Sequence, residues 1–178
     1  MKTYVTYGFL LALGGALLNL VLFFLGFHSE VEKLGSAQWI GGIVGLIIGV
    51  TLTVLGVRAR RGEVPVAEPF GYGRALGAAV MITLFASLFG AVFNLIYMQF
   101  INPGFQDVLV QAQLAKLEAK GLAGAQLDQA EKMTRIFTGP VVSSCVNFIV
   151  GMFFGTIISL IIAAFVRRPA SAAPIAAS

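Results

Sequence analysis

Charged residues are scarce in this 178-residue chain, and four long stretches contain none of them. Asp, Glu, Lys and Arg make up 11% of the sequence, against about a quarter of a typical soluble domain. The stretches without them are 3–29, 34–57, 75–106 and 136–166. Each exceeds the roughly 20 residues that cross about 30 Å of hydrocarbon as a helix. The sequence therefore predicts an all-α integral membrane protein and excludes an ordinary soluble domain.

Cysteine and histidine are nearly absent as well. The single cysteine, Cys145, allows no intrachain disulfide, and the single histidine, His28, ends the first stretch, where we expect it to be solvated. Haem and metal sites in membrane bundles need several histidines or carboxylates on facing helices. Nucleophilic catalysis would need a base beside Ser143 or Ser144. We therefore expect no enzyme activity, no metal and no cofactor.

Four transmembrane helices are predicted, at about 5–27, 39–57, 75–101 and 141–166. Because the first connection is short, neighbouring helices should run antiparallel. The predicted fold is an antiparallel four-helix bundle that forms one membrane domain over residues 1–168. The first span is longer than the roughly 7–15 apolar residues of a signal peptide, so we expect it to be an uncleaved anchor.

Residues 102–138 form the only sizeable polar segment, and we expect them to lie outside the cytoplasm. Asn-Pro-Gly at 102–104 should end the third span. DVLVQAQLAKLEAKG and AQLDQAEKMTRIF each favour a helix, and Gly121 and Gly124 mark a turn between them. We predict an extracytoplasmic helical hairpin whose apolar faces meet; the alternative is an amphipathic loop in the lipid headgroups. The Ala-, Ser- and Pro-rich tail, 169–178, is predicted to be disordered.

Basic residues gather on one side of the predicted topology. The termini and the loop after the second span carry seven Lys or Arg against two Glu, whereas the other side carries five against six acidic residues. This bias predicts cytoplasmic termini in a bacterial inner membrane. Arg58, Arg60 and Arg61 end the second span and are candidate ligands for lipid headgroups, although topology alone explains them. The net charge of +4 thus points to membrane lipids and not to nucleic acid.

Small residues recur every four positions along two of the predicted spans. Gly41, Gly45 and Gly49 form one such stripe, and Gly151 and Gly155 belong to a second. In lipid, small residues let helix backbones approach closely, which is where association energy comes from. We predict a glycine zipper that packs helices within one bundle. The alternative is a homodimer seam along the first stripe.

Three asparagines lie inside the spans, Asn19, Asn94 and Asn147. At about 1.5 Å rise per residue they lie about 12, 10 and 9 Å below the outer ends of their helices. An amide that faced lipid would leave its donors and acceptors unpaired. We therefore predict one polar layer in which the amides meet each other or a water. The alternative is that each amide bonds a nearby backbone carbonyl separately.

Several segments resemble a family of small bacterial membrane proteins, the domain-of-unknown-function family four-one-nine-nine. They are FGYGRALGAAVMITLFASL, NLIYMQFINPGF, the charged LAKLEAKG segment and the Gly-Pro before the last span. The resemblance implies four spans with an outward helical insertion. Because the family has no assigned activity, it supplies no catalytic residues.

Two classes of function remain open from the sequence. The first is a structural or interaction protein whose outer segment or basic loop meets a membrane or periplasmic partner. The second is a small channel or transporter that passes a neutral solute through an uncharged polar pocket. We favour the first, because spans without charges have little with which to select ions. Convergence of the Asn, Ser and Thr side chains on one cavity would favour the second.

Overall fold

The computed structural model describes residues 1–168 and is helical outside its connections. The elements are α1 (Lys2–Phe24), α2 (Val31–Gly62), α3 (Tyr72–Ile96), the π-helical turn η1 (Tyr97–Ile101), α4 (Phe105–Glu118), α5 (Ala125–Thr138) and α6 (Pro140–Val166). Four helices are long and apolar enough to cross a membrane, namely α1, α2, α3 with η1, and α6. The prediction of an all-α protein with four such helices is confirmed. The predicted disordered tail, 169–178, lies outside the described residues.

The first two helices differ from the predicted spans at their ends. α1 stops at Phe24, before the predicted Phe27, because the chain turns at Gly26, whose φ of +79° favours glycine. α2 extends well beyond the predicted 39–57, since polar residues continue the helix at both ends. An acidic residue in its first turn and arginines in its last turn complement the helix dipole.

The third helix ends as predicted, but through an unusual turn. η1 widens the last turn of α3, and the amide of Asn102 bonds the carbonyl of Tyr97 at 2.7 Å. Pro103 then prevents continuation of the helix. The last helix begins with Pro140 in its first turn, where the missing N–H costs no hydrogen bond.

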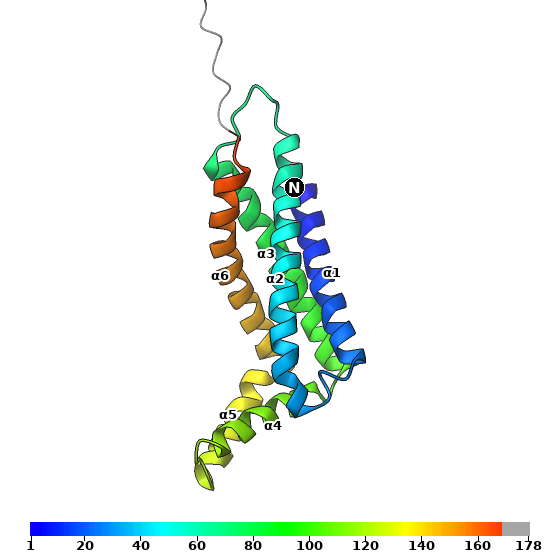
Figure 1. Cartoon of the computed structure of the whole chain (residues 1–178), viewed down its shortest axis with the longest axis vertical. Helices are drawn as coiled ribbons and strands as arrows, with labels where there is room; N and C mark the ends of the chain where they lie inside the picture. The colour runs from blue at the N-terminus through cyan, green and yellow to red at the C-terminus, as the bar shows by residue number, and fades with distance from the viewer. Residues whose placement is uncertain (169–178) are drawn as a thin grey trace, which may run out of the picture.

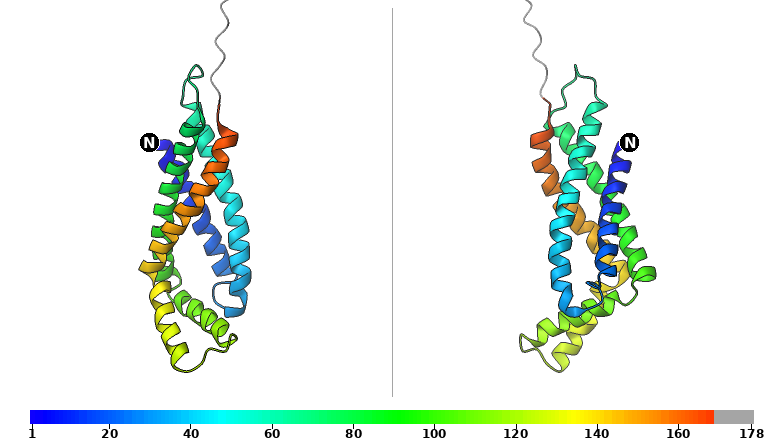
Figure 2. Two further views of the ribbon diagram at one scale, coloured as in Figure 1. Left: turned by 90° about the vertical axis from the view of Figure 1, so that its left-hand side faces the viewer. Right: turned by 45° about the vertical axis from the view of Figure 1, so that its right-hand side comes forward.

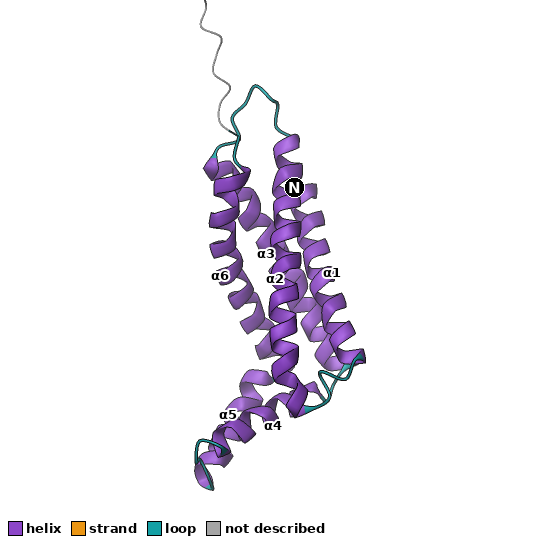
Figure 3. Ribbon diagram, in the orientation of Figure 1, coloured by secondary structure: helices purple, strands orange, loops and turns teal. Residues whose placement is uncertain are grey.

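The four long helices lie side by side along the long axis of the molecule (Figure 1). The N-terminus, the loop 63–71 and the end of α6 lie at one end, which we call the basal end. α4 and α5 project from the opposite, distal end, as two further views show (Figure 2). Coloured by secondary structure, the described chain contains helices and loops without a strand (Figure 3).

The tightest packing lies at the basal end. Ala75, Ala78 and Ala79 are at most 2% exposed, and these small side chains let α2 and α6 approach α3 closely. The buried cluster there consists of Val57, Phe70, Ala75, Ala78, Ala79, Ile82, Ile162, Ala163 and Val166. The bundle is therefore well filled where α1 begins and α6 ends.

Backbone hydrogen bonds close the same end. Phe70 and Arg168 exchange two of them, from Phe70 N to Arg168 O at 3.1 Å and from Arg168 N to Phe70 O at 2.8 Å. The guanidinium of Arg168 also donates to the carbonyls of Val64, Pro65 and Glu68. These bonds fasten the loop 63–71 over the end of α6.

The distal end is covered unevenly. Val110 and Ala112 of α4 are buried, but no residue of α5 is. Met133, Ile136 and Phe137 of α5 are about half exposed or more. α4 packs against α5 and against α2, so the two apolar faces cover each other only in part: Leu127 and Ala130 of α5 are half-buried, whereas Met133 and Phe137 are exposed.

Candidate functional site

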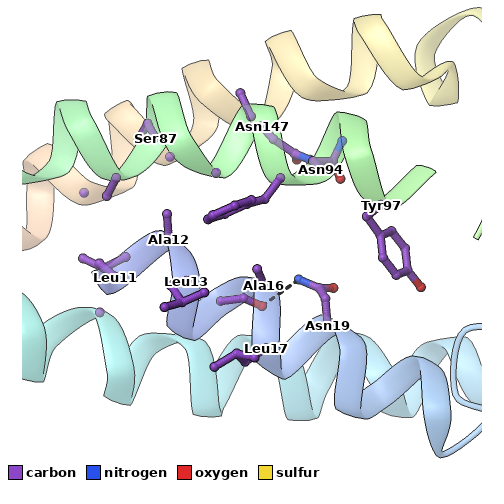
Figure 4. Close-up of a pocket in the computed structure, with 18 of the residues that line it drawn as sticks. Leu11, Ala12, Leu13, Ala16, Leu17, Asn19, Ser87, Asn94, Tyr97 and Asn147 are labelled. Carbon is purple, nitrogen blue, oxygen red and sulfur yellow. Dashed lines mark hydrogen bonds between the residues drawn. The ribbon is translucent and has the colours of Figure 1, made fainter. Parts of the chain in front are cut away.

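A cavity of about 530 Å³ lies between the four long helices. All four contribute to its wall, and most of the lining is apolar (Figure 4). The residues that line it include no Asp, Glu, Lys, Arg or His. Its polar side chains are Asn19, Thr53, Thr83, Ser87, Asn94, Tyr97 and Asn147. We call this space the central cavity.

The three asparagines of the predicted polar layer all line the central cavity. Asn19 of α1 faces Asn94 of α3 across it (Figure 4). Within the described chain no hydrogen bond joins the three amides to one another. Asn19 Nδ2 instead donates to the Gly15 carbonyl at 3.1 Å, as the alternative expected, so the layer shares a cavity without direct contact.

The amide of Asn94 links α3 to α6. Its Nδ2 donates to Ser144 Oγ at 2.9 Å and to Ser143 Oγ at 3.3 Å. Both hydroxyls donate in turn to the Pro140 carbonyl, at 2.7 and 3.2 Å. These serines thus serve as helix-to-helix bonds, which satisfy polar groups inside the membrane.

The glycines of α6 allow a close approach to α3. A Cβ added at Gly155 would lie 2.3 Å from Thr83 Cγ2, and one added at Gly151 would lie 2.9 Å from Ser87 Oγ. Real Cβ atoms essentially never approach another heavy atom below 3 Å, so a side chain at Gly155 would force Thr83 to move, whereas at Gly151 a rotation of the Ser87 hydroxyl would relieve the contact. This is the contact that the small-residue stripe of the last span predicted.

The stripe on α2 behaves differently. A Cβ added at Gly45 or Gly49 would meet no atom within 4 Å, and one at Gly41 would meet only Leu22 Cδ1 at 3.7 Å. The predicted close packing of this stripe is therefore wrong within the chain. The reason is that α2 packs tightly only near the basal end, so farther along it the glycines border open space.

That open space includes a second cavity, of about 330 Å³, which we call the outer cavity. Gly41 and Gly45 line it, while Gly49 lines the central cavity. The two cavities share Gly15 and Asn19 of α1. The glycine stripe of α2 thus forms a smooth wall that runs past both cavities.

His28 lies beside the outer cavity and is only 4% exposed, so the expectation that it is solvated is wrong. The turn after α1 folds it under α4, where its ring lies 4.7 Å from the Phe105 ring. Its Nδ1 is 2.6 Å from Tyr97 Oη, which also accepts a hydrogen bond from Asn102 Nδ2 at 3.1 Å. The residues next to His28 do not indicate that it is buried, because Tyr97 and Phe105, which contact its ring, come about seventy residues later.

Burial lowers the pKa of His28, and the pH dependence of stability should show it. The unfolded chain binds this proton near pH 6.5 while the folded chain does not, so His28 destabilises the fold increasingly as pH falls below that value. The test compares melting temperatures in detergent at pH 7.5 and at pH 5.5, about one unit on either side of that pKa. We expect the melting temperature of the unchanged chain to fall more over this interval than that of His28→Phe. An equal fall of the melting temperature in both proteins would contradict the lowered pKa of His28.

Two of the three arginines at the end of α2 form hydrogen bonds with other residues of the protein. Arg60 Nε donates to Tyr4 Oη at 2.9 Å and pairs with Glu63, while Arg61 donates to the Val166 carbonyl at 3.0 Å. Arg58 is exposed. Arg60 and Arg61 therefore tie helix ends together, and of the three Arg58 has the freest side chain for a lipid phosphate.

Comparisons with known proteins place the chain in a family. No curated protein and no solved structure matches it. The model of a family described as "Protein of unknown function (DUF4199)" matches residues 6–168, which include all six α-helices almost completely. The match confirms the resemblance seen in the sequence. The chain therefore belongs to the DUF4199 family of proteins of unknown function.

Proposed function

We propose that this protein binds a small, neutral, largely apolar molecule in the central cavity. The observation that carries the proposal is the convergence of uncharged polar side chains from four helices on one cavity with apolar walls. Its volume of about 530 Å³ lies within the roughly 300–1,000 Å³ of small-molecule sites. A few oriented amides and hydroxyls in an apolar pocket are the usual means of fixing such a ligand.

The cavity favours a binding or transport role over a purely structural one. A bundle that served only as a scaffold would gain dispersion energy by filling this space. The lining carries no charge, so a charged solute would lose its hydration without a partner. The packed basal end supports a pocket that opens toward one side of the membrane and not a continuous channel.

The proposed setting is a bacterial inner membrane. The excess of basic residues at the basal end supports cytoplasmic termini, with four antiparallel spans and the α4–α5 hairpin on the outside. Membrane lipids are the expected surroundings, since large apolar side chains such as Phe165 and Ile149 are exposed on the bundle. We propose no enzymatic reaction and no contact with nucleic acid.

An interaction role is the second candidate, and one observation favours it. The apolar side of α5, with Met133, Ile136 and Phe137, lies uncovered at the distal end of the bundle. A membrane or periplasmic protein could cover it. A homodimer along Gly41, Gly45 and Gly49 would instead have to close both cavities, which makes it the weaker form of this candidate.

Photolabelling tests the proposed ligand site. The full chain is reconstituted in phosphatidylcholine vesicles with a long-chain alkyl diazirine, and adducts are mapped by mass spectrometry. We expect adducts on cavity residues such as Ala16 and Ala86. Gly49→Leu should place its side chain in the cavity and lower them about tenfold, which corresponds to about 1.4 kcal/mol of lost binding.

The matched control is Gly42→Leu. Gly42 lies on the same helix, has open space around it and is exposed, but it does not line the central cavity. Cavity adducts in this variant should equal those of the unchanged chain, as should adducts on lipid-facing Phe165 in every variant. Cavity adducts that Gly49→Leu leaves unchanged would overturn the proposed function.

A further inference from the structure

The outer cavity contains an oriented hydrogen-bond donor that the central site does not use. Tyr97 Oη accepts from Asn102 Nδ2, and among the described residues His28 Nδ1, 2.6 Å away, is the one acceptor within reach of the Tyr97 hydroxyl proton, which makes Nδ1 the acceptor of this bond. A neutral imidazole that accepts at Nδ1 carries its proton on Nε2. Among the described residues, Nε2 has no hydrogen-bond partner. The buried ring of His28 is part of the wall of this cavity, so its unpaired Nε2–H is a donor available to a ligand there.

The rest of the outer cavity is neutral. Gln38 and Asn19 contribute carboxamides, and apolar side chains such as Leu22 and Leu34 form most of the remaining wall. No Asp, Glu, Lys or Arg lines it. A phosphate or carboxylate would therefore lose hydration without gaining a countercharge. A carbonyl oxygen, by contrast, fits an imidazole N–H and amide N–H groups.

The two cavities adjoin along one side of the bundle. Gly15 and Asn19 belong to both, and Gly41, Gly45 and Gly49 continue the wall from the outer to the central cavity. Because an added Cβ at Gly45 or Gly49 would meet nothing within 4 Å, the missing side chains leave room along this wall. The smaller outer cavity, with its imidazole and two carboxamides, and the larger, mostly apolar central cavity match the head and the chain of an amphiphile.

We infer that the two cavities bind one amphiphile, with a neutral carbonyl-bearing head against His28 Nε2 and Gln38 and an apolar chain in the central cavity. This inference rests on the proposed function and adds the chemistry of the head. A neutral acylglycerol and an alkylated quinone both carry that chemistry. Tyr97 and Asn102 are positioning residues, since they act through the proton arrangement of His28.

The test compares four photoactivatable probes on the full chain in phosphatidylcholine vesicles. They share one alkyl diazirine chain and carry no head, a glycerol ester, a benzoquinone or a phosphate. The two carbonyl heads should raise labelling of the central cavity roughly five- to tenfold over the headless chain, as one net hydrogen bond of about 1–1.4 kcal/mol does. The carbonyl head that gives the larger gain shows whether the ligand is an acylglycerol or a quinone. The phosphate head should give no gain over the headless chain.

Variants at the turn separate head recognition from folding. His28→Leu should remove the gain from the carbonyl heads, whereas His28→Gln, which keeps a donor, should retain part of it. Ser29→Ala is the matched control, because Ser29 is adjacent and exposed and lines neither cavity. Labelling by the headless chain should be the same in all three variants, which verifies the fold.

The outcomes distinguish the two proposals. Equal labelling by headless and carbonyl probes, a gain that survives His28→Leu, or a larger gain with the phosphate would each overturn the inference about the head. In those cases the Gly49-dependent labelling by the headless chain would still support the central site. Loss of that dependence would overturn the proposed function itself.

Discussion

Replacement of Gly155 by leucine should destabilise the protein by about 3 kcal/mol, the upper part of the usual range for overpacking. Even the first carbon of the new side chain would lie 2.3 Å from Thr83 Cγ2. Thr83 is 6% exposed, its Oγ1 lies 3.4 Å from Ser159 Oγ, and its β-branched side chain has few χ1 rotamers, so a rotation of Thr83 relieves little of this contact. The backbones of α3 and α6 would have to separate. The measurement is thermal unfolding of the purified protein in detergent.

Gly42→Leu, on α2, is the control for Gly155→Leu, because it adds the same side chain to another membrane-spanning helix. An added Cβ there meets nothing within 4 Å, and we expect its melting temperature to match that of the unchanged chain. The glycine zipper predicted from the sequence implies a large loss of stability in Gly45→Leu. The open space around Gly45 implies a small loss instead. Equal melting temperatures for the Gly155 and Gly42 variants would show that α3 and α6 do not approach as described.

Maleimide labelling of single cysteines should show which end of the bundle faces the outside of the cell, because an impermeant reagent reaches only that side. In a chain with Cys145→Ala, a cysteine at Gln113 of α4 should react with an impermeant maleimide added outside intact cells. A cysteine at Gly62, at the end of α2, should react only after the inner membrane is opened. Both positions are exposed, so burial does not limit either reaction. The basis is the crowding of basic residues at the basal end.

Labelling of the native thiol sets the background, since Cys145 is exposed on α6 within the apolar span. A functional check is that each single-cysteine chain reaches the membrane at the level of the parent. The opposite accessibility of the two positions would reverse the proposed orientation and would place the outer cavity on the cytoplasmic side.

The sequence predicted the helices well because membrane spanning depends on local composition. Runs without charge have to be helical in lipid, and Pro103 fixes the end of the third span wherever its neighbours lie. The common depth of Asn19, Asn94 and Asn147 also followed from helical rise alone. Their convergence on one cavity was therefore within reach of the sequence.

The relative rotation and tilt of the helices could not be predicted from the sequence. The same four-residue spacing of glycine gives a tight contact at Gly155 and an open wall at Gly45, because partners from distant parts of the chain decide the difference. His28 illustrates the same limit, since the residues that bury it, Tyr97 and Phe105, come from η1 and α4. One signal was present: Tyr97 falls at the same membrane depth as the turn after α1.

The unequal packing along the bundle gives the molecule a gradient of mechanical stiffness. Interlocked alanines and the bonds of Arg168 hold the basal end, whereas the distal halves of α1 and α2 face space that no side chain fills. Local opening costs least where few buried contacts are lost. We therefore expect any separation of the helices to begin at the distal end, with the packed basal end as its fixed point. Spreading at the distal end would let the two cavities accept ligands of different width while the basal ends of the helices stay in place.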